Sequence, residues 1–282
     1  MTTIKDLELK SIRYRREILS MISKANAGHT AGDLSCIDIL NVLYNKIMDI
    51  RPENFSSSHR DHYIQSKGHS VEALYAVLAD IGFYDLADLD TLNQYKSHYV
   101  GHPTRAVNGI EHNTGALGHG LSVAVGIALA LKKDLQPYRV FTLLGDGELE
   151  EGSNWEACMS AAHYQLDNLI AIVDRNTLQI TDYTENVSQL EPLEDKFRAF
   201  GFSVKSVDGN SILDLTRVFE DIPFERGKPN LVMARTIKGK GISFIENNLA
   251  WHHHAPTSDE FHSAFHELDL AEMKWKQAYE PG

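Results

Sequence analysis

Apolar runs of strand length alternate with helix-like segments to the end of this chain. Residues 140–144 and 169–173 are continuous apolar runs, the pattern of strands that are buried on both faces. Strands that alternate with helices predict an α/β fold, a doubly wound parallel sheet with helices on both faces. Further strands are expected at 63–66 and 230–236, and helices over 5–25, from about 35 onward, and over 121–131, 193–200 and 211–222.

Composition limits the class of protein. The chain has 282 residues, 43% of them hydrophobic, which is enough for a substantial core. No internal repeat, low-complexity segment or Pro/Gly/Ser-rich linker divides it, so we expect one domain over residues 1–282. The formal net charge of −12, without a basic cluster, argues against nucleic acid or an anionic membrane as a partner.

The lack of a recognisable targeting signal and the use of cysteine lead us to expect a cytoplasmic location. The N-terminus is charged throughout, without the apolar core of a signal peptide, and no run reaches the ~18 apolar residues of a membrane span. Cys36 and Cys158 lack metal-site spacing and fit a reducing compartment. We therefore expect a cytoplasmic protein.

An acidic glycine turn follows the first apolar run. Asp146 lies in a Gly-Asp-Gly triplet after residue 144, and Asn176 follows the second run. One crossover helix fits between them, so both turns are expected at the carboxyl edge of the sheet, where ligands bind in open α/β folds. Asp146, the Asn176 amide oxygen and a backbone carbonyl near Leu178 would be hard ligands for Mg²⁺, with phosphate oxygens completing its shell.

The triplet alone also fits an ordinary tight turn with solvated Glu148, Glu150 and Glu151. The second motif at Asn176 argues against that interpretation, because one βαβ step would bring both turns together. The pair of motifs resembles the thiamine diphosphate motif. Loop glycines Gly115, Gly118 and Gly120 would suit a close backbone approach to a ligand.

Four histidines stand beside glycine, proline or tryptophan in loops: His29, His69, His102 and His252. Singly, each fits a helix cap or a surface histidine. Together with the diphosphate motif they favour contacts to cofactor or substrate, and His69 opens a helix, where anions are favoured. A zinc site is the competing hypothesis, but no H-x-x-x-H or paired Cys/His spacing supports it.

Several segments together resemble the N-terminal, pyrophosphate-binding half of transketolase, in the order found in that family. They are SKANAGHTAGDLS (23–35), SKGHSVEALYAVL (66–78), VGHP (100–103), NTGALGHGLSVAVG (113–126), GDGELEEG (145–152), IAIVDRN (170–176) and TIKGKGISFIENNLAWHHHAP (236–256). The resemblance covers nearly the whole chain. Two departures, His29-Thr30-Ala31 for the usual HPG and His119 for a glutamine, concern donor preference.

The resemblance implies thiamine diphosphate and Mg²⁺ as cofactors, and it implies roles for matching residues. The implied metal ligands are Asp146, Asn176 and the Leu178 carbonyl, and the groups touching the diphosphate are His69, Gly147 and His252. The implied lining of the cofactor is Gly115, Leu117, Asp174, Ile180 and Ile237, and the histidines facing the donor sugar are His29, His102 and His252.

The pyrimidine-binding and C-terminal domains of long transketolases have no counterpart here. The resemblance therefore implies the N-terminal subunit of a split transketolase, assembled as two copies of each chain with a C-terminal, pyrimidine-binding partner. Such an enzyme transfers a two-carbon ketol unit from a ketose or ketose phosphate to an aldose. The partner would supply the glutamate that activates the cofactor.

Two alternatives remain at this point. One is a related carboligase similar to 1-deoxyxylulose-phosphate synthase. The other is a non-catalytic subunit that holds the cofactor and has a regulatory role. The four loop histidines beside an intact metal motif favour transketolase chemistry, because a silent subunit has no chemical need for them.

Overall fold

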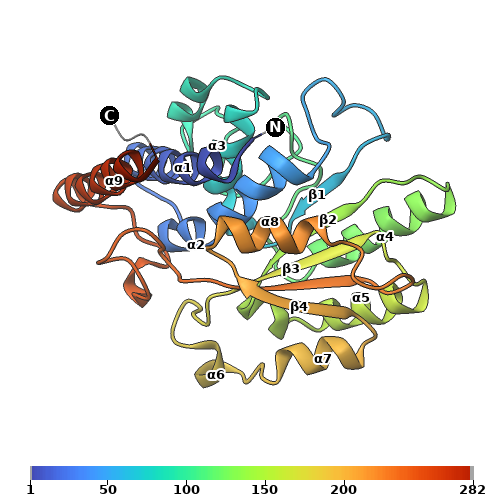
Figure 1. The fold of residues 1–282 in the computed structure, drawn as a ribbon. Helices are drawn as coiled ribbons and strands as arrows, with labels where there is room; N and C mark the ends of the chain where they lie inside the picture. The colour runs from blue at the N-terminus through green and yellow to red at the C-terminus, as the bar shows by residue number, and fades with distance from the viewer. Residues whose placement is uncertain (1, 280–282) are drawn as a thin grey trace.

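One parallel sheet organises the chain (Figure 1). The computed structural model describes residues 2–279. Within them, five strands lie in the order β1-β2-β3-β5-β4, and every neighbouring pair is parallel. The strands are β1 (His62–Gln65), β2 (Val140–Gly145), β3 (Leu169–Arg175), β4 (Ser203–Asp208) and β5 (Asn230–Arg235).

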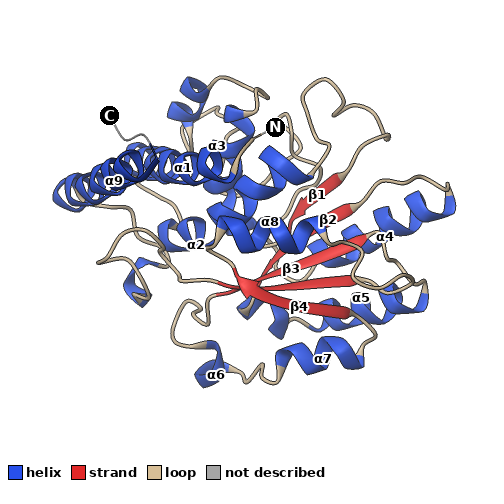
Figure 2. Ribbon diagram, in the orientation of Figure 1, coloured by secondary structure: helices blue, strands red, loops and turns tan. Residues whose placement is uncertain are grey.

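Helices cover both faces of the sheet (Figure 2), as the apolar pattern predicted. Side chains of a strand alternate between two cores: Phe141 and Leu143 pack into the core on the side of α1, α2, α3 and α8, and Val140 and Leu144 into the core on the side of α4, α5 and α7. The doubly wound α/β fold is thereby confirmed. The longer helices are α1 (Ile4–Ala25), α2 (Thr30–Val42), α3 (Val71–Asp80), α4 (Gly120–Lys133), α5 (Gly152–His163), α7 (Leu193–Ala199), α8 (Ile212–Glu220) and α9 (Ser258–Tyr279).

Short helical turns complete the description, and several of them carry loop residues of the site. They are η1 (Leu43–Ile47), η2 (Gly68–Ser70), η3 (Leu86–Thr91), η4 (Gly147–Glu150), α6 (Thr184–Val187) and η5 (Leu249–Trp251). No helix within residues 2–279 is both long and apolar enough to cross a membrane.

Two expectations about local structure were wrong. Helix α2 begins at Thr30, not near Ser35, because Gly32 is accommodated inside the helix against Ser70 and His69. The alternation of strand and helix does not continue to the end of the chain, since β5 is followed by an irregular segment, η5 and α9, which packs against α1 (Figure 1).

The sheet places both cofactor motifs at one edge, as expected. Gly145 pairs with Asp174 in the β2–β3 register, so Asp146 and Asn176 leave neighbouring strands nearly level with each other. The loops after β1 and β5 begin at the same edge, because the strands are parallel. Four loops that are distant in sequence therefore meet at the carboxyl edge of the sheet.

Candidate active site

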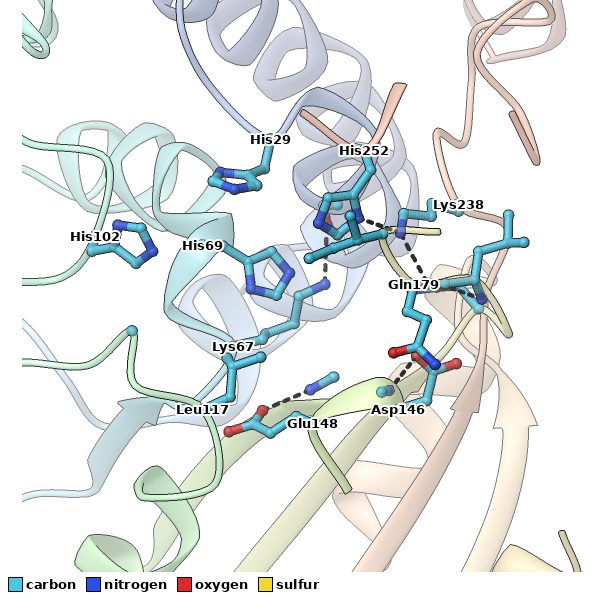
Figure 3. A pocket seen from close by; sticks show the side chains of 17 residues that line it. His29, Lys67, His69, His102, Leu117, Asp146, Glu148, Gln179, Lys238 and His252 are labelled. Atoms are coloured by element: carbon cyan, nitrogen blue, oxygen red, sulfur yellow. Dashed lines mark hydrogen bonds between the residues drawn. The ribbon is translucent and has the colours of Figure 1, made fainter. Parts of the chain in front are cut away.

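A cavity of about 240 Å³ lies at this carboxyl edge (Figure 3). The loops after β1, β2, β3 and β5 line it, together with the glycine loop before α4 and the start of α2. Eleven of the thirteen site residues expected from sequence are in its lining: His29, His69, His102, Gly115, Leu117, Asp146, Gly147, Asn176, Leu178, Ile180 and His252.

Oxygen atoms gather at one end of the cavity. Asp146 Oδ2 accepts from the backbone N–H of Thr177 at 2.6 Å and from Arg175 at 3.2 Å, while Oδ1 accepts from Gly147 N–H at 2.9 Å. Asn176 Oδ1 accepts from Leu178 N–H at 3.1 Å. These contacts anchor both side chains to the backbone of the loop after β3, and both residues line the cavity.

The charge on Asp146 reflects opposing influences. Burial and the nearby Asp174 raise its pKa, while Arg175 and the two backbone donors lower it. A divalent cation would favour the ionised form that a ligand must adopt.

The donor set fits Mg²⁺ bound together with a diphosphate. A carboxylate, an amide oxygen and the Leu178 carbonyl are hard oxygen donors, and that carbonyl now accepts from Lys238 Nζ at 2.9 Å. Among residues 2–279 no three His, Cys, Asp or Glu side chains are arranged to hold a metal, so a metal here depends on amide, carbonyl and anion oxygens.

Imidazole rings gather at the other end of the cavity (Figure 3). The ring centroid of His29 lies 5.3 Å from that of His69, 6.0 Å from His102 and 5.7 Å from His252. The four histidines expected from separate loops are thus neighbours. Sequence reasoning missed a fifth, His253, whose ring centroid lies 4.7 Å from that of His29.

The histidines are held in their neutral form. Burial lowers the pKa of His29 to about 4 and that of His252 to about 3, and nearby imidazoles and lysines add to both shifts. Burial also lowers the pKa values of His69 and His102. Near pH 7 each ring therefore has one N–H donor and one acceptor nitrogen.

Two buried lysines supply positive charge, and neither was expected from sequence. Lys67 Nζ pairs with Asp174 and donates to the Gly32 carbonyl at 3.1 Å. Lys238 Nζ lies 2.8 Å from His252 Nδ1, and burial together with Lys67 lowers the pKa of Lys238 to about 8. Both lysines line the cavity.

Glu148 differs from the solvated side chain that an ordinary turn would have. It is 2% exposed and accepts from Gly118 N–H at 2.9 Å, from Gly145 N–H at 3.0 Å and from Ser66. It therefore ties the glycine loop to the turn after β2. Gln179, also missed, lines the cavity and donates to Glu150 at 2.8 Å.

The other two of the thirteen expected residues lie elsewhere, and so do two of the three loop glycines. Asp174 is fully buried behind the cavity, where Ser35, Thr236 and Lys67 donate to it. Ile237 lines a separate surface hollow beside Asn210 and Lys240. Gly118 and Gly120 do not line the cavity: a Cβ atom would come within 2.5 Å of Glu151 Cβ at the first and 2.3 Å of Ser66 Oγ at the second.

The lining glycine Gly115 has a positive φ of 134°, and a Cβ atom there would come within 2.6 Å of His102. Gly68, on the facing loop, approaches the backbone nitrogen of Gly115 so closely that a Cβ atom would lie 2.7 Å from it. The two loops therefore require glycine at this crossing.

The fold and this site together define a protein built to hold a diphosphate cofactor. The family described as "Transketolase, thiamine diphosphate binding domain" matches residues 8–276, and the chain belongs to the transketolase family.

Three relatives of similar length are named as subunits. The chain is 46% identical to a subunit of the apulose-4-phosphate transketolase of Phocaeicola vulgatus, over 94% of each chain. It is 42% identical to the 6-deoxy-6-sulfo-D-fructose transketolase subunit SqwG of a Clostridium species, over 94% of this chain and 96% of the relative.

Solved structures agree with the fold. The transketolase of Campylobacter jejuni superposes with a TM-score of 0.83 at 32% identity, over 100% of this chain and 49% of that one. The chain thus spans about half the length of the solved transketolases it matches. It is a transketolase-type subunit with a thiamine diphosphate-binding domain.

Proposed function

We propose that this chain is the N-terminal subunit of a two-chain transketolase. With a pyrimidine-binding partner it transfers a two-carbon ketol unit from a ketose phosphate to an aldose. One observation carries the proposal: a single cavity brings the oxygens of Asp146 and Asn176 together with four neutral histidines. The subunit names of the relatives support a partner chain.

At one end of the cavity, Asp146, Asn176 and the Leu178 carbonyl would hold Mg²⁺ against the diphosphate. When bound, thiamine diphosphate supplies a nucleophilic carbon and an electron sink for carbon–carbon cleavage. Lys238 donates to His252 Nδ1, so the imidazole proton is on Nε2 and can be donated to a phosphate oxygen or a sugar carbonyl.

At the other end, His29 and His102 are placed for the substrate. His29 Nδ1 is buried without a hydrogen-bond partner within the part of the chain that is described. A buried polar nitrogen of this kind is costly to leave unpaired, and a sugar hydroxyl would satisfy it. We assign both histidines to the donor sugar, where they would hold hydroxyls and stabilise charge that develops on the carbonyl oxygen.

The donor proposed is a ketose with an anionic group far from its carbonyl. The names of two relatives include apulose-4-phosphate and 6-deoxy-6-sulfo-D-fructose. Two-carbon transfer by the assembled enzyme should be faster from a ketose phosphate than from the same ketose without phosphate. Equal kcat/KM values for both would remove this part of the proposal.

His29→Ala and His102→Ala are expected to reduce kcat/KM for the donor by about 100-fold or more, since a positioned hydrogen-bond or proton-transfer group contributes 10²–10⁴-fold. Thiamine diphosphate affinity should change little. Steady-state kinetics and calorimetry of the assembled complex measure both quantities.

The matched control for these two variants is His262→Ala, an exposed histidine on α9. It should keep wild-type kinetics. Wild-type kcat/KM in both His29→Ala and His102→Ala would leave these rings as structural groups only.

A further inference from the structure

Two buried acids lie behind the histidines and have no part in the chemistry proposed above. Asp33 is in the first turn of α2, Glu72 is in the first turn of α3, and both are 0% exposed. Asp33 Oδ1 accepts from Ala73 N–H at 2.8 Å. Asp33 Oδ2 and both carboxyl oxygens of Glu72 have no hydrogen-bond donor among residues 2–279.

The proton count at this pair follows from its contacts. Asp33 Oδ1 accepts from the N–H of Ala73, the residue that follows Glu72, so the two buried carboxyl groups are neighbours. Ionised carboxylates only accept hydrogen bonds, so two of them cannot satisfy each other. Lys67 is the nearby cation, but its ammonium donates to the Gly32 carbonyl and to Asp174 instead. One proton held between the acids would turn one of them into a donor.

We propose that Asp33 and Glu72 share a proton, with neutral Glu72 donating to Asp33, and that this acid pair positions His29 and His69. Asp33 supplies the cap of α3, since Ser70 at its N-cap makes no side-chain capping bond. The pair therefore joins the first turns of two helices.

Those two turns carry the histidines. His29 is the N-cap residue of α2, and His69 lies in η2, directly before α3. The first turn of α2 packs closely on His69, since a Cβ atom on Gly32 would lie 3.5 Å from His69 Cδ2. The link between Asp33 and Glu72 thus fixes one ring relative to the other. This positioning role rests on the proposed function, whereas the shared proton does not.

Electrostatics agree with the geometry. Burial raises the pKa of Asp33 to about 7, and burial together with Asp33 raises that of Glu72 well above its usual range. The other titratable groups facing the pair are Lys67, Cys36 and Tyr75. Burial raises the pKa of Cys36 to about 12 and also raises that of Tyr75, while Asp174 keeps Lys67 charged.

The shared proton determines how the free energy of unfolding changes with pH. The folded chain keeps the Glu72 proton at mildly alkaline pH, whereas the unfolded chain has released it above the ordinary glutamate pKa. Each proton that only the folded state keeps makes the unfolding equilibrium constant rise about tenfold per pH unit. Stability from this pair is therefore lost as pH rises.

Urea unfolding of the full chain alone, between about pH 7.5 and 9, tests the shared proton. The unfolding constant of wild type should rise with pH more steeply than that of Glu72→Gln, by up to about tenfold per unit. The lowered pKa of Lys238 affects wild type and Glu72→Gln equally, so it cancels in the difference between their slopes. Glu53→Gln, at an exposed glutamate, should match wild type. Equal slopes for wild type and Glu72→Gln would overturn the proposal.

Infrared spectroscopy of the wild-type chain gives a second measurement that does not depend on a variant folding. A protonated carboxyl band should persist at mildly alkaline pH, and it should disappear in Glu72→Gln. Absence of that band from wild type would also overturn the shared proton.

The positioning role is tested on the chain alone by NMR of labelled histidines. Glu72→Gln keeps a donor and should leave the His29 and His69 signals in place. Glu72→Met has a similar length but no donor, and it should shift both signals while His262 stays unchanged. Asp33→Leu, which has a similar size but no acceptor, is the second variant if Glu72→Met does not fold, and it should shift both signals. Unmoved His29 and His69 signals in the folded variant would overturn the positioning role.

The same variants separate this proposal from the proposed function. If two-carbon transfer is absent from the assembled wild type while the NMR shifts occur, the acid pair stands and the enzymatic assignment does not. If transfer occurs, Glu72→Met should lower kcat and Glu72→Gln should restore it. Equal kcat values for these two variants would count against positioning.

Discussion

Alanine at Asp146 or Asn176 is expected to abolish Mg²⁺-dependent binding of thiamine diphosphate. Each substitution would remove an oxygen from the proposed metal shell, in which few ligands come from the protein. Loss of groups that only support metal ligands already costs about 10–100-fold in affinity, so loss of a ligand should cost more than about 100-fold. Asp146→Ala also removes the acceptor that holds Thr177 N–H, so the loop after β3 loses an anchor.

Calorimetry of the assembled complex with Mg²⁺ and cofactor measures this effect. Asp182→Ala and Asn186→Ala are matched controls, because both residues lie in the segment between β3 and α7 but outside the cavity lining. Circular dichroism should establish that all four variants are folded. Wild-type cofactor affinity in Asp146→Ala and Asn176→Ala would remove the metal-site assignment.

The fold could be predicted from sequence where strands are buried on both faces. Strands β2 and β3 are wholly buried, and their continuous apolar runs predicted them. Strand β4 was missed because it lies at the sheet edge, where its residues are half-buried or exposed and its pattern is polar. Local pattern also says nothing about β5 pairing between β3 and β4, since that order depends on contacts distant in sequence. The single-domain organisation stays a prediction.

Some residues of the cavity could be predicted from sequence and others could not. The predicted ones belong to recognisable motifs that follow the ends of strands. Lys67 and Lys238 were missed because a lysine is usually exposed, and these two are 1–2% exposed only through tertiary packing. A signal for Lys67 was its place beside Gly68-His69 at the end of β1.

His253 was missed for a different reason. In a run of three histidines each ring points in its own direction, and sequence does not say which direction faces the site. The structure brings His252 to the cavity and places the His253 ring near His29. His254 instead lies against Trp251 and Glu260, away from this contact.

Apolar surface beside the cavity bears on assembly. Ile180, a lining residue, is 71% exposed, and Tyr183 and Val187 in the same segment between β3 and α7 are 48% and 47% exposed. Helix α4 adds an open outer surface, where a Cβ atom on Gly126 would have no neighbour within 4 Å among the described residues. Burial of such surface would favour a partner at this edge.

The purified chain alone is expected to have no two-carbon transferase activity and to gain it when a pyrimidine-binding chain is added. Two acids of the turn after β2 are not free to take the role of the glutamate proposed for a partner: Glu148 is tied to backbone N–H groups of two loops, and Glu150 bonds Gln179. Without the partner the pyrimidine ring would also remain in water, where its proton transfers are poorly controlled. Transfer rates of the separate and mixed chains measure the gain.

The prediction about activity has a counterpart in the way the chains assemble. We expect two copies of each chain, since isologous two-fold interfaces are the commonest way to close such an assembly. A charge at the proposed interface, Gly126→Asp on the open outer side of α4, should weaken assembly and activity together, because it buries an unpaired carboxylate. Glu267→Gln on α9, away from that surface, is the control. Full activity from the isolated chain, verified free of any partner by mass spectrometry, would contradict the proposal that a second chain completes the active site. It would require a catalytic base within this sequence.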